Sequence, residues 1–214
     1  FNVYEFYPLT TTAFSNISQL KEALLDHVDI DPANIFSPDG FMEKDNVYEF
    51  CRNYERQIQQ AGGIDYMLLG IGHACNIGFN GPGSSINTAT RLVFMDNDSR
   101  KEASRTFNFI ENIPSSVITM GMSTILKSKH VILMAWGEDK ASTIRSAVEG
   151  KMSDSMPATF LQNQENAKVV IDLSAAYNLT RISHPWLVTN CDWDNKLIRR
   201  AIVWLCQTTK KPIL

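Results

Sequence analysis

The residues with the clearest potential for chemistry lie in one glycine-rich segment. Residues 72–85 read GHACNIGFNGPGSS, with four glycines, two amide side chains, two hydroxyls and His73. They follow directly on the apolar run at 64–71 (IDYMLLGI), which is typical of a central parallel strand covered on both faces. Because glycine lets backbone N–H groups approach a ligand closely, this pattern predicts a site for a polar or anionic small molecule. The alternative is a plain surface loop.

Two cations later in the chain are candidates for holding an anion. Arg105 lies on a predicted helix that Asp98 caps, and Lys140 lies in the first turn of the helix after Trp136 and Gly137. The start of a helix favours negative charge. A lysine and an arginine that converge on one phosphate are a common arrangement, although each alone is more often a solvated surface charge.

The elements that must position these residues alternate along the chain. Apolar runs predict strands at residues 1–6, 64–71, 92–95, 117–120, 131–136 and 168–173. Amphipathic spacing predicts helices at 17–28, 45–58, 99–107, from 122, at 138–148 and at 195–208. Alternating strands and helices favour an α/β sandwich with a mostly parallel sheet. Ligands bind beyond the carboxyl ends of such strands, which is where residues 72–85 lie.

Several predicted helices carry specific expectations. Ile17, Leu20, Leu24 and Val28 should form one buried face, and Asp45 should cap the second helix. In the last helix, the residues expected to be buried are Leu197, Ile198, Ala201, Ile202 and Leu205.

Composition excludes several classes of protein. The chain has 214 residues, 44% hydrophobic and 20% charged, which suits one globular domain over residues 1–214. No apolar stretch of about 18 residues is present, so no membrane span is expected. A net charge of −3 without a basic patch argues against nucleic acid as a partner. The four cysteines show no zinc-ligand spacing, so no metal is expected and a reducing cytoplasm fits best.

Several separate motifs stand in the order and spacing of one known family. They are FNVYEF at 1–6, LLGIG at 68–72, IGFNGPGSS at 77–85, TRLV at 90–93, KEASR at 101–105, VITMG at 117–121, WGEDKA at 136–141 and AVEG at 147–150. From Phe1 to about Leu173 the chain resembles the glucosamine-6-phosphate deaminase (isomerase) family. The resemblance implies a three-layer α/β/α, Rossmann-like sandwich that needs no cofactor. It also implies the conversion of glucosamine 6-phosphate and water to fructose 6-phosphate and ammonia.

The resemblance also identifies the acid–base positions, and all four are altered. Tyr4 stands where the family has the aspartate that takes the C2 proton, and Asn76 where it has the ring-opening histidine. Ala74 and Gly81 replace the carboxylates that support this histidine. Because loss of one base typically costs about 10²- to 10⁴-fold in rate, we expect deamination to be weak or lost.

The remaining candidates fall into two groups. The catalytic candidates are Tyr4, Glu5, His73 and Asn76, and the substrate-binding candidates are Gly72, Asn80, Gly81, Arg105 and Lys140. Arg105 and Lys140 match the family's phosphate residues. Glu5 should point away from Tyr4 if both lie on a strand, and His73 lies near enough in sequence to reach the pocket.

Three functions remain open from the sequence. The first is a domain that binds an amino-sugar phosphate through Arg105 and Lys140 with little or no deamination. The second is an isomerase or lactonase on a related sugar phosphate, and the third is a structural or homo-oligomerisation module. Because Phe1 already reads as strand, we expect a piece of a longer protein that lacks an N-terminal strand and its phosphate loop. Residues 184–212 resemble the bacterial subgroup in which a deacetylase-like domain follows.

Overall fold

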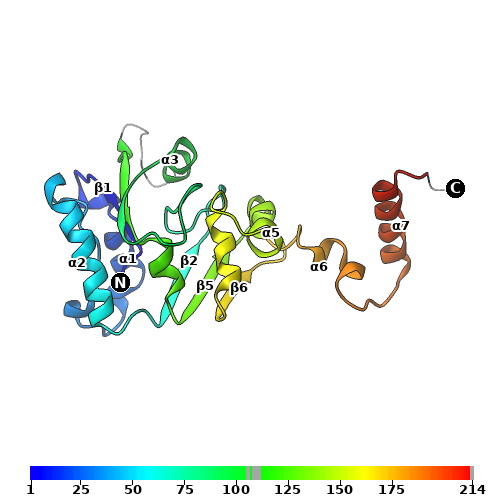
Figure 1. Cartoon of the computed structure of the whole chain (residues 1–214), viewed down its shortest axis with the longest axis horizontal. Helices are drawn as coiled ribbons and strands as arrows, with labels where there is room; N and C mark the ends of the chain where they lie inside the picture. Colours follow the sequence, from blue (N-terminus) through cyan, green and yellow to red (C-terminus); the bar gives the residue numbers. More distant parts are fainter. Residues whose placement is uncertain (105–106, 108–111, 213–214) are drawn as a thin grey trace.

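The computed structural model describes residues 1–104, 107 and 112–212 (Figure 1). Its strands are β1 (Tyr4–Tyr7), β2 (Tyr66–Gly70), β3 (Arg91–Phe94), β4 (Ser116–Thr119), β5 (His130–Ala135) and β6 (Ala167–Ile171). Its α-helices are α1 (Asn16–Ala23), α2 (Val47–Gln60), α3 (Asn97–Ala103), α4 (Met122–Leu126), α5 (Ala141–Glu149), α6 (Thr180–Ser183) and α7 (Asn195–Thr209). Among the described residues, no helix is long and apolar enough to cross a bilayer.

The expected α/β fold with a parallel sheet is confirmed. Strands β2, β5 and β6 form this sheet in the order β2-β5-β6, with Leu68 opposite Ile132 and Ile132 opposite Lys168. Helix α5 lies between β5 and β6 in the chain, so these elements form a strand–helix–strand unit of the kind that parallel pairing requires. All three strands therefore end at one edge, where the glycine-rich segment begins.

The other three strands form a separate antiparallel sheet in the order β1-β4-β3. Thr119 of the central strand β4 lies opposite both Tyr4 and Arg91. The sequence pattern predicts one mostly parallel sheet, and the division into two sheets differs from that prediction. An apolar run shows that a strand is buried, but it does not show the direction of its neighbour.

One face of the parallel sheet holds the main core. Met67 and Leu69 of β2 are buried there with Ile144 of α5 and Tyr54 of α2. On the opposite face of β2, Tyr66 and Leu68 are 66% and 56% exposed. The expectation that residues 64–71 are covered on both faces is therefore wrong for this structure, because only one face of β2 is packed and the face with Tyr66 and Leu68 is open.

The helices agree with the sequence pattern only in part. In α2, Val47, Cys51, Tyr54 and Ile58 are buried as predicted. Helix α1 is shorter than expected, because Leu24 leaves helical geometry at φ −143° and ψ −55°. As a result Leu24 and Val28, two members of the predicted buried face, are exposed.

Two predicted helix caps also differ. The residue at the start of α2 is Asn46, because Lys44–Asn46 forms a 3-10 turn through the expected cap Asp45. At α3 the carboxylate of Asp96, not Asp98, accepts from the Ser99 backbone N–H at 2.7 Å. Both shifts are of one or two residues, the usual uncertainty of helix ends.

The chain beyond β6 extends away from the two sheets (Figure 1). It contains α6 and α7, and no residue of α7 is buried. Ile198, Ile202 and Leu205 are 40%, 42% and 52% exposed. The expectation that the last helix buries its apolar face is therefore wrong here, because the segment before it carries the helix off the body of the protein.

Candidate functional site

A tight turn at the carboxyl end of β2 opens the glycine-rich segment. The Gly72 N–H donates to the carbonyl of Asn76 at 3.0 Å, and the Cys75 N–H donates to the carbonyl of Gly72 at 3.1 Å. A side chain at Gly72 would overlap the side-chain amide of Asn76, which would then have to move. The turn thus brings two of the predicted site residues into contact.

Two non-glycine residues of this segment have left-handed backbone. Cys75 has φ 58° and Phe79 has φ 56°, a conformation that costs free energy for side chains other than glycine and recurs at functional sites. Cys75 is buried, and burial raises the pKa of its thiol to about 11. The thiol therefore stays protonated at neutral pH and does not act as a nucleophile.

Asn80 holds the segment from inside. It is fully buried, and its Nδ2 donates to the carbonyls of Ile77 at 3.0 Å and Met120 at 2.9 Å. Its Oδ1 accepts from Arg91 Nη1 at 2.8 Å. These contacts assign Asn80 to positioning the loop, although the sequence predicted a residue that touches substrate.

Arg91 also holds this loop, a role that the sequence pattern did not predict. Its guanidinium bonds Asn80 and also donates to Ser84 Oγ at 3.1 Å, so it joins the two ends of residues 80–84. The side chain is half-buried, and burial lowers its pKa. The only signal in the sequence was an arginine at the start of an apolar strand, which does not indicate what the guanidinium faces.

Tyr4, Gly72 and Asn76 line one cleft of about 640 Å³. The ring of Tyr4 meets the ring of Phe79 edge to face, with centroids 4.7 Å apart. The open face of β2 forms another wall. Among the described residues that line this cleft there is no Asp, Glu, His, Lys or Arg. The cleft therefore offers hydrogen-bonding and apolar groups for a ligand, but no side chain suited to act as a base at neutral pH.

Glu5 lies on the side of β1 opposite this cleft. Its carboxylate is buried and accepts from the backbone N–H groups of Phe6, Asn16 and Ile17 at 3.0, 2.7 and 3.0 Å. It also accepts from Ser15 Oγ at 2.8 Å. Both oxygens are thus used to hold the first turn of α1, and this placement argues against a catalytic role for Glu5.

His73 forms a second group with the segment after β5. Its Nε2 lies 3.7 Å from Asp139 Oδ2, with both side chains about half exposed. Its carbonyl accepts from Thr143 Oγ1 of α5 at 3.3 Å. Lys140 follows Asp139 in the 3-10 turn Glu138–Lys140 that leads into α5. His73 is not among the residues that line the cleft of Tyr4 and Asn76. Asp139 was not among the residues that the sequence predicted for the site.

The last two predicted binding residues are Gly81 and Arg105. Gly81 lines a separate, smaller cleft of about 210 Å³, together with Asp96. Arg105 lies outside the described residues. Within the described part of the chain, no group of three or more His, Cys, Asp or Glu side chains is arranged to hold a metal ion.

In α/β proteins with a parallel sheet, small polar ligands bind beyond the carboxyl ends of the strands. The glycine-rich loop of this chain lies at that edge of its sheet. Residues 5–171 match the family described as glucosamine-6-phosphate isomerases/6-phosphogluconolactonase. The chain therefore belongs to this family, whose description names enzymes of phosphorylated sugars.

Three relatives illustrate the similarity. A glucosamine-6-phosphate deaminase-like protein of Bacteroides thetaiotaomicron is 61% identical over all of this chain and 32% of its own length. The glucosamine-6-phosphate deaminase of Shewanella woodyi is 45% identical over 75% of this chain and 60% of its own. The structure of a monomeric glucosamine-6-phosphate deaminase superimposes with a TM-score of 0.79 and 34% identity, over 83% of this chain and 73% of that one. The chain thus spans less than two thirds of the length of both sequence relatives.

Proposed function

We propose that this chain binds a hexosamine phosphate and that the family's deamination is weak or lost in it. The cleft of Tyr4 and Asn76 receives the sugar. Lys140, at the start of α5, receives the phosphate together with Arg105, the position that the family resemblance assigns to this role.

One observation carries the proposal. Gly72 and Gly78 of the glycine-rich segment line the cleft, yet its described lining contains no carboxylate, imidazole, lysine or arginine side chain. Glu5 is the neighbouring carboxylate on β1, and it is fully used in holding α1. Isomerisation of an aldose to a ketose needs a base at C2, so this lining supports binding without efficient turnover.

The start of α5 supports the phosphate contact. Residues 138–140 form a 3-10 turn that leads into the nine-residue helix, and Lys140 lies at its junction. The N–H groups at the start of a helix are directed toward an anion that approaches there, and an ammonium group adds a charge-assisted hydrogen bond.

The proposal is tested by two measurements on one sample. A coupled assay measures fructose 6-phosphate and ammonia from glucosamine 6-phosphate, and thermal denaturation with and without this ligand measures binding. We expect no significant turnover, together with a rise in Tm that shows binding. Lys140→Ala should weaken binding at least about tenfold, whereas the exposed Lys168→Ala should leave it unchanged. Efficient deamination, or no binding, would overturn the proposal.

The pairing of His73 with Asp139 favours a second candidate function. A histidine beside a carboxylate is a common proton-transfer pair, and here His73 lies 3.7 Å from Asp139 at the carboxyl end of β2. This candidate is an isomerase or lactonase on a related sugar phosphate. Turnover of a hexose phosphate or of 6-phosphogluconolactone that disappears in His73→Gln would support it over the first proposal. The subgroup with a following deacetylase-like domain stays a prediction from residues 184–212.

A further inference from the structure

The carboxylate of Asp172 lies where the chain leaves two neighbouring strands of the parallel sheet. Asp172 directly follows β6, and the last residues of β5 and β6, Ala135 and Ile171, pair with each other. The two strands therefore end side by side at their carboxyl ends. Because ligands of parallel sheets bind at that edge, Asp172 lies at the same edge as the glycine-rich segment.

This carboxylate joins the two chain segments that leave the strands. The Gly137 N–H donates to both oxygens of Asp172, at 3.2 Å to Oδ1 and 3.3 Å to Oδ2. Oδ1 also accepts from the Ala175 N–H at 2.8 Å. Hydrogen bonds to a carboxylate are stronger than those between neutral groups. Asp172 thus ties the chain after β5 to the chain after β6.

Gly137 is a position where such a tie matters. Its backbone has φ 90° and ψ 155°, a region that residues with a side chain rarely adopt. A Cβ at this position would lie 2.8 Å from Asp139 Oδ1. Because glycine has the most conformational freedom to lose on folding, an untied Gly137 would let the turn that follows take several orientations. The bonds to Asp172 select one of them.

The turn that starts at Gly137 carries two residues of the candidate site. The Lys140 N–H donates to the Gly137 carbonyl at 3.2 Å, and the turn leads into α5. Asp139 Oδ2 lies 3.7 Å from His73 Nε2. The orientation of Gly137 therefore sets the places of both Asp139 and Lys140.

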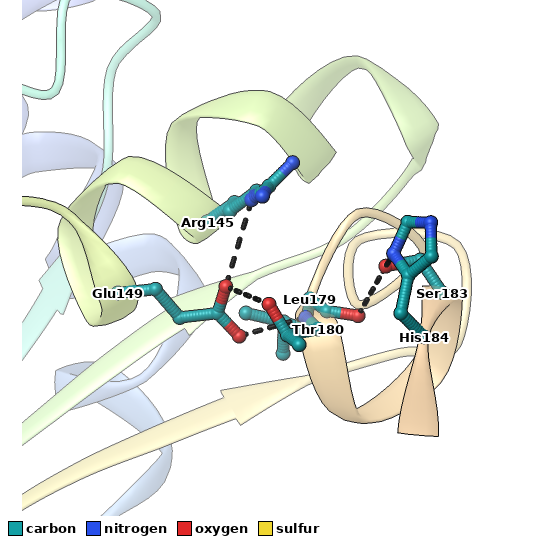
Figure 2. Close-up of polar contacts among 6 residues, drawn as sticks. All are labelled: Arg145, Glu149, Leu179, Thr180, Ser183 and His184. Carbon is teal, nitrogen blue, oxygen red and sulfur yellow. Dashed lines mark hydrogen bonds and ion pairs between the residues drawn. The ribbon is translucent and has the colours of Figure 1, made fainter. Parts of the chain in front are cut away.

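A second carboxylate holds the same chain segment at the other end of α5. Glu149, the last residue of α5, accepts from the backbone N–H and from Oγ1 of Thr180, both at 2.7 Å. Arg145 Nε lies 3.5 Å from the same carboxylate (Figure 2). Glu149 thus also stabilises the chain after β6, but at the end of the helix opposite to residues 137–140. It provides a matched control for Asp172.

We propose that Asp172 is a positioning residue of the ligand site. Its carboxylate fixes Gly137, so that Lys140 stands at the start of α5 and Asp139 faces His73. The expected effect on ligand affinity rests on the proposed function, in which Lys140 receives the phosphate. The hold of Asp172 on the turn does not depend on a ligand and is measurable without one.

Amide hydrogen exchange, followed by NMR of the ¹⁵N-labelled 214-residue chain, tests this hold directly. Asp172→Ala should speed exchange at the Gly137 and Lys140 N–H groups at least about tenfold. The N–H of Leu133, in the central strand β5, should keep its rate. Unchanged exchange at Gly137 would overturn the proposal. So would an equal acceleration at Leu133, because that would show a general loosening of the fold.

Two further variants separate the tie to Gly137 from stability in general. Asp172→Asn keeps Oδ1, the oxygen that accepts from both Gly137 and Ala175, so exchange at Gly137 should stay within about threefold of the unaltered chain. Glu149→Ala removes the bonds to Thr180 and should leave exchange at Gly137 unchanged. If Glu149→Ala accelerates Gly137 as much as Asp172→Ala does, the assigned role is wrong.

Calorimetric titration with glucosamine 6-phosphate measures the consequence for the site. Asp172→Ala should weaken binding at least about tenfold, whereas Asp172→Asn and Glu149→Ala should stay within about threefold. In a Lys140→Ala background, Asp172→Ala should add less than about a threefold loss, because both changes remove the same contact. Unchanged affinity in Asp172→Ala, or losses that multiply fully in the double variant, would overturn the positioning role.

The two measurements keep this inference distinct from the proposed function. If the unaltered chain does not bind glucosamine 6-phosphate, the proposed function fails, and hydrogen exchange at Gly137 and Lys140 alone decides whether Asp172 holds the turn. If the chain binds the ligand and Asp172→Ala binds it equally well, the proposed function stands and the role of Asp172 fails.

Discussion

Glu5 illustrates how a residue's chemistry depends on its partners. The alternation of a strand correctly separates Glu5 from Tyr4, because neighbouring side chains point to opposite faces. The structure adds what Glu5 faces: the first N–H groups of α1, which have no partner within the helix. A carboxylate accepts several such bonds at once, so this residue stabilises the fold and not a transition state.

Replacement of Glu5 by glutamine should test that assignment. Glutamine has one acceptor oxygen, so its NH₂ group would meet backbone donors that the carboxylate now satisfies. We expect Glu5→Gln to lower the free energy of unfolding by about 2–3 kcal/mol in urea denaturation. Glu22→Gln, on the exposed side of α1, should change it by less than about 0.5 kcal/mol. Equal stability of the two variants would contradict the structural role.

The buried cysteines should show a pH dependence that follows from their burial. Burial raises the pKa of both Cys51 and Cys75 to about 11, because it disfavours the thiolate. At pH 8 only about one thiol in a thousand is then ionised. We expect iodoacetamide to label Cys191 and Cys206 readily at pH 8 and to leave Cys51 and Cys75 unmodified, as measured by peptide mass spectrometry. Their reactivity should rise only as the pH approaches 11, and labelling of Cys75 at pH 8 in the folded protein would contradict its placement.

At the scale of elements, the glycine-rich segment shows how much sequence can predict. Composition correctly indicated a loop after β2, because glycines and amides cluster there, and that this loop accepts a ligand stays a prediction. It did not show that Asn80 faces inward, because an asparagine side chain serves a ligand or a backbone carbonyl equally well. That choice depends on Arg91, the first residue of β3, and on Met120, which directly follows β4.

Loss of the Asn80 side chain should therefore loosen this loop. Asn80→Ala leaves the Met120 carbonyl and the Arg91 guanidinium without their partner, and it should lower the free energy of unfolding by about 2–3 kcal/mol. Asn87→Ala, at an exposed position of the same loop, should change it by less than about 0.5 kcal/mol. Chemical denaturation measures both. If Asn80→Ala loses ligand affinity at full stability, the original prediction of a substrate contact would be favoured.

At the scale of the whole molecule, the described structure has a folded body and an arm, residues 180–212, that adds little to it. Helix α7 buries none of its residues. A chain that ends at Ser183 keeps the bonds of Thr180 to Glu149 and should unfold with a free energy within about 1 kcal/mol of the full chain. Thermal and urea denaturation of the two proteins provide the comparison. A much larger loss would mean that the arm packs on the body.

The sequence by itself determined the family, the α/β class and the position of the loop, because periodicity and motif spacing are local properties of the chain. It also identified the altered positions Tyr4, Ala74, Asn76 and Gly81. Only the tertiary structure decided that the strands divide into two sheets and that Glu5 and Asn80 hold the fold. It likewise decided that His73 lies beside Asp139 and that α7 stands free of the body. These outcomes depend on contacts between residues far apart in the chain, and hydrophobic periodicity shows that a face is apolar without showing what covers it.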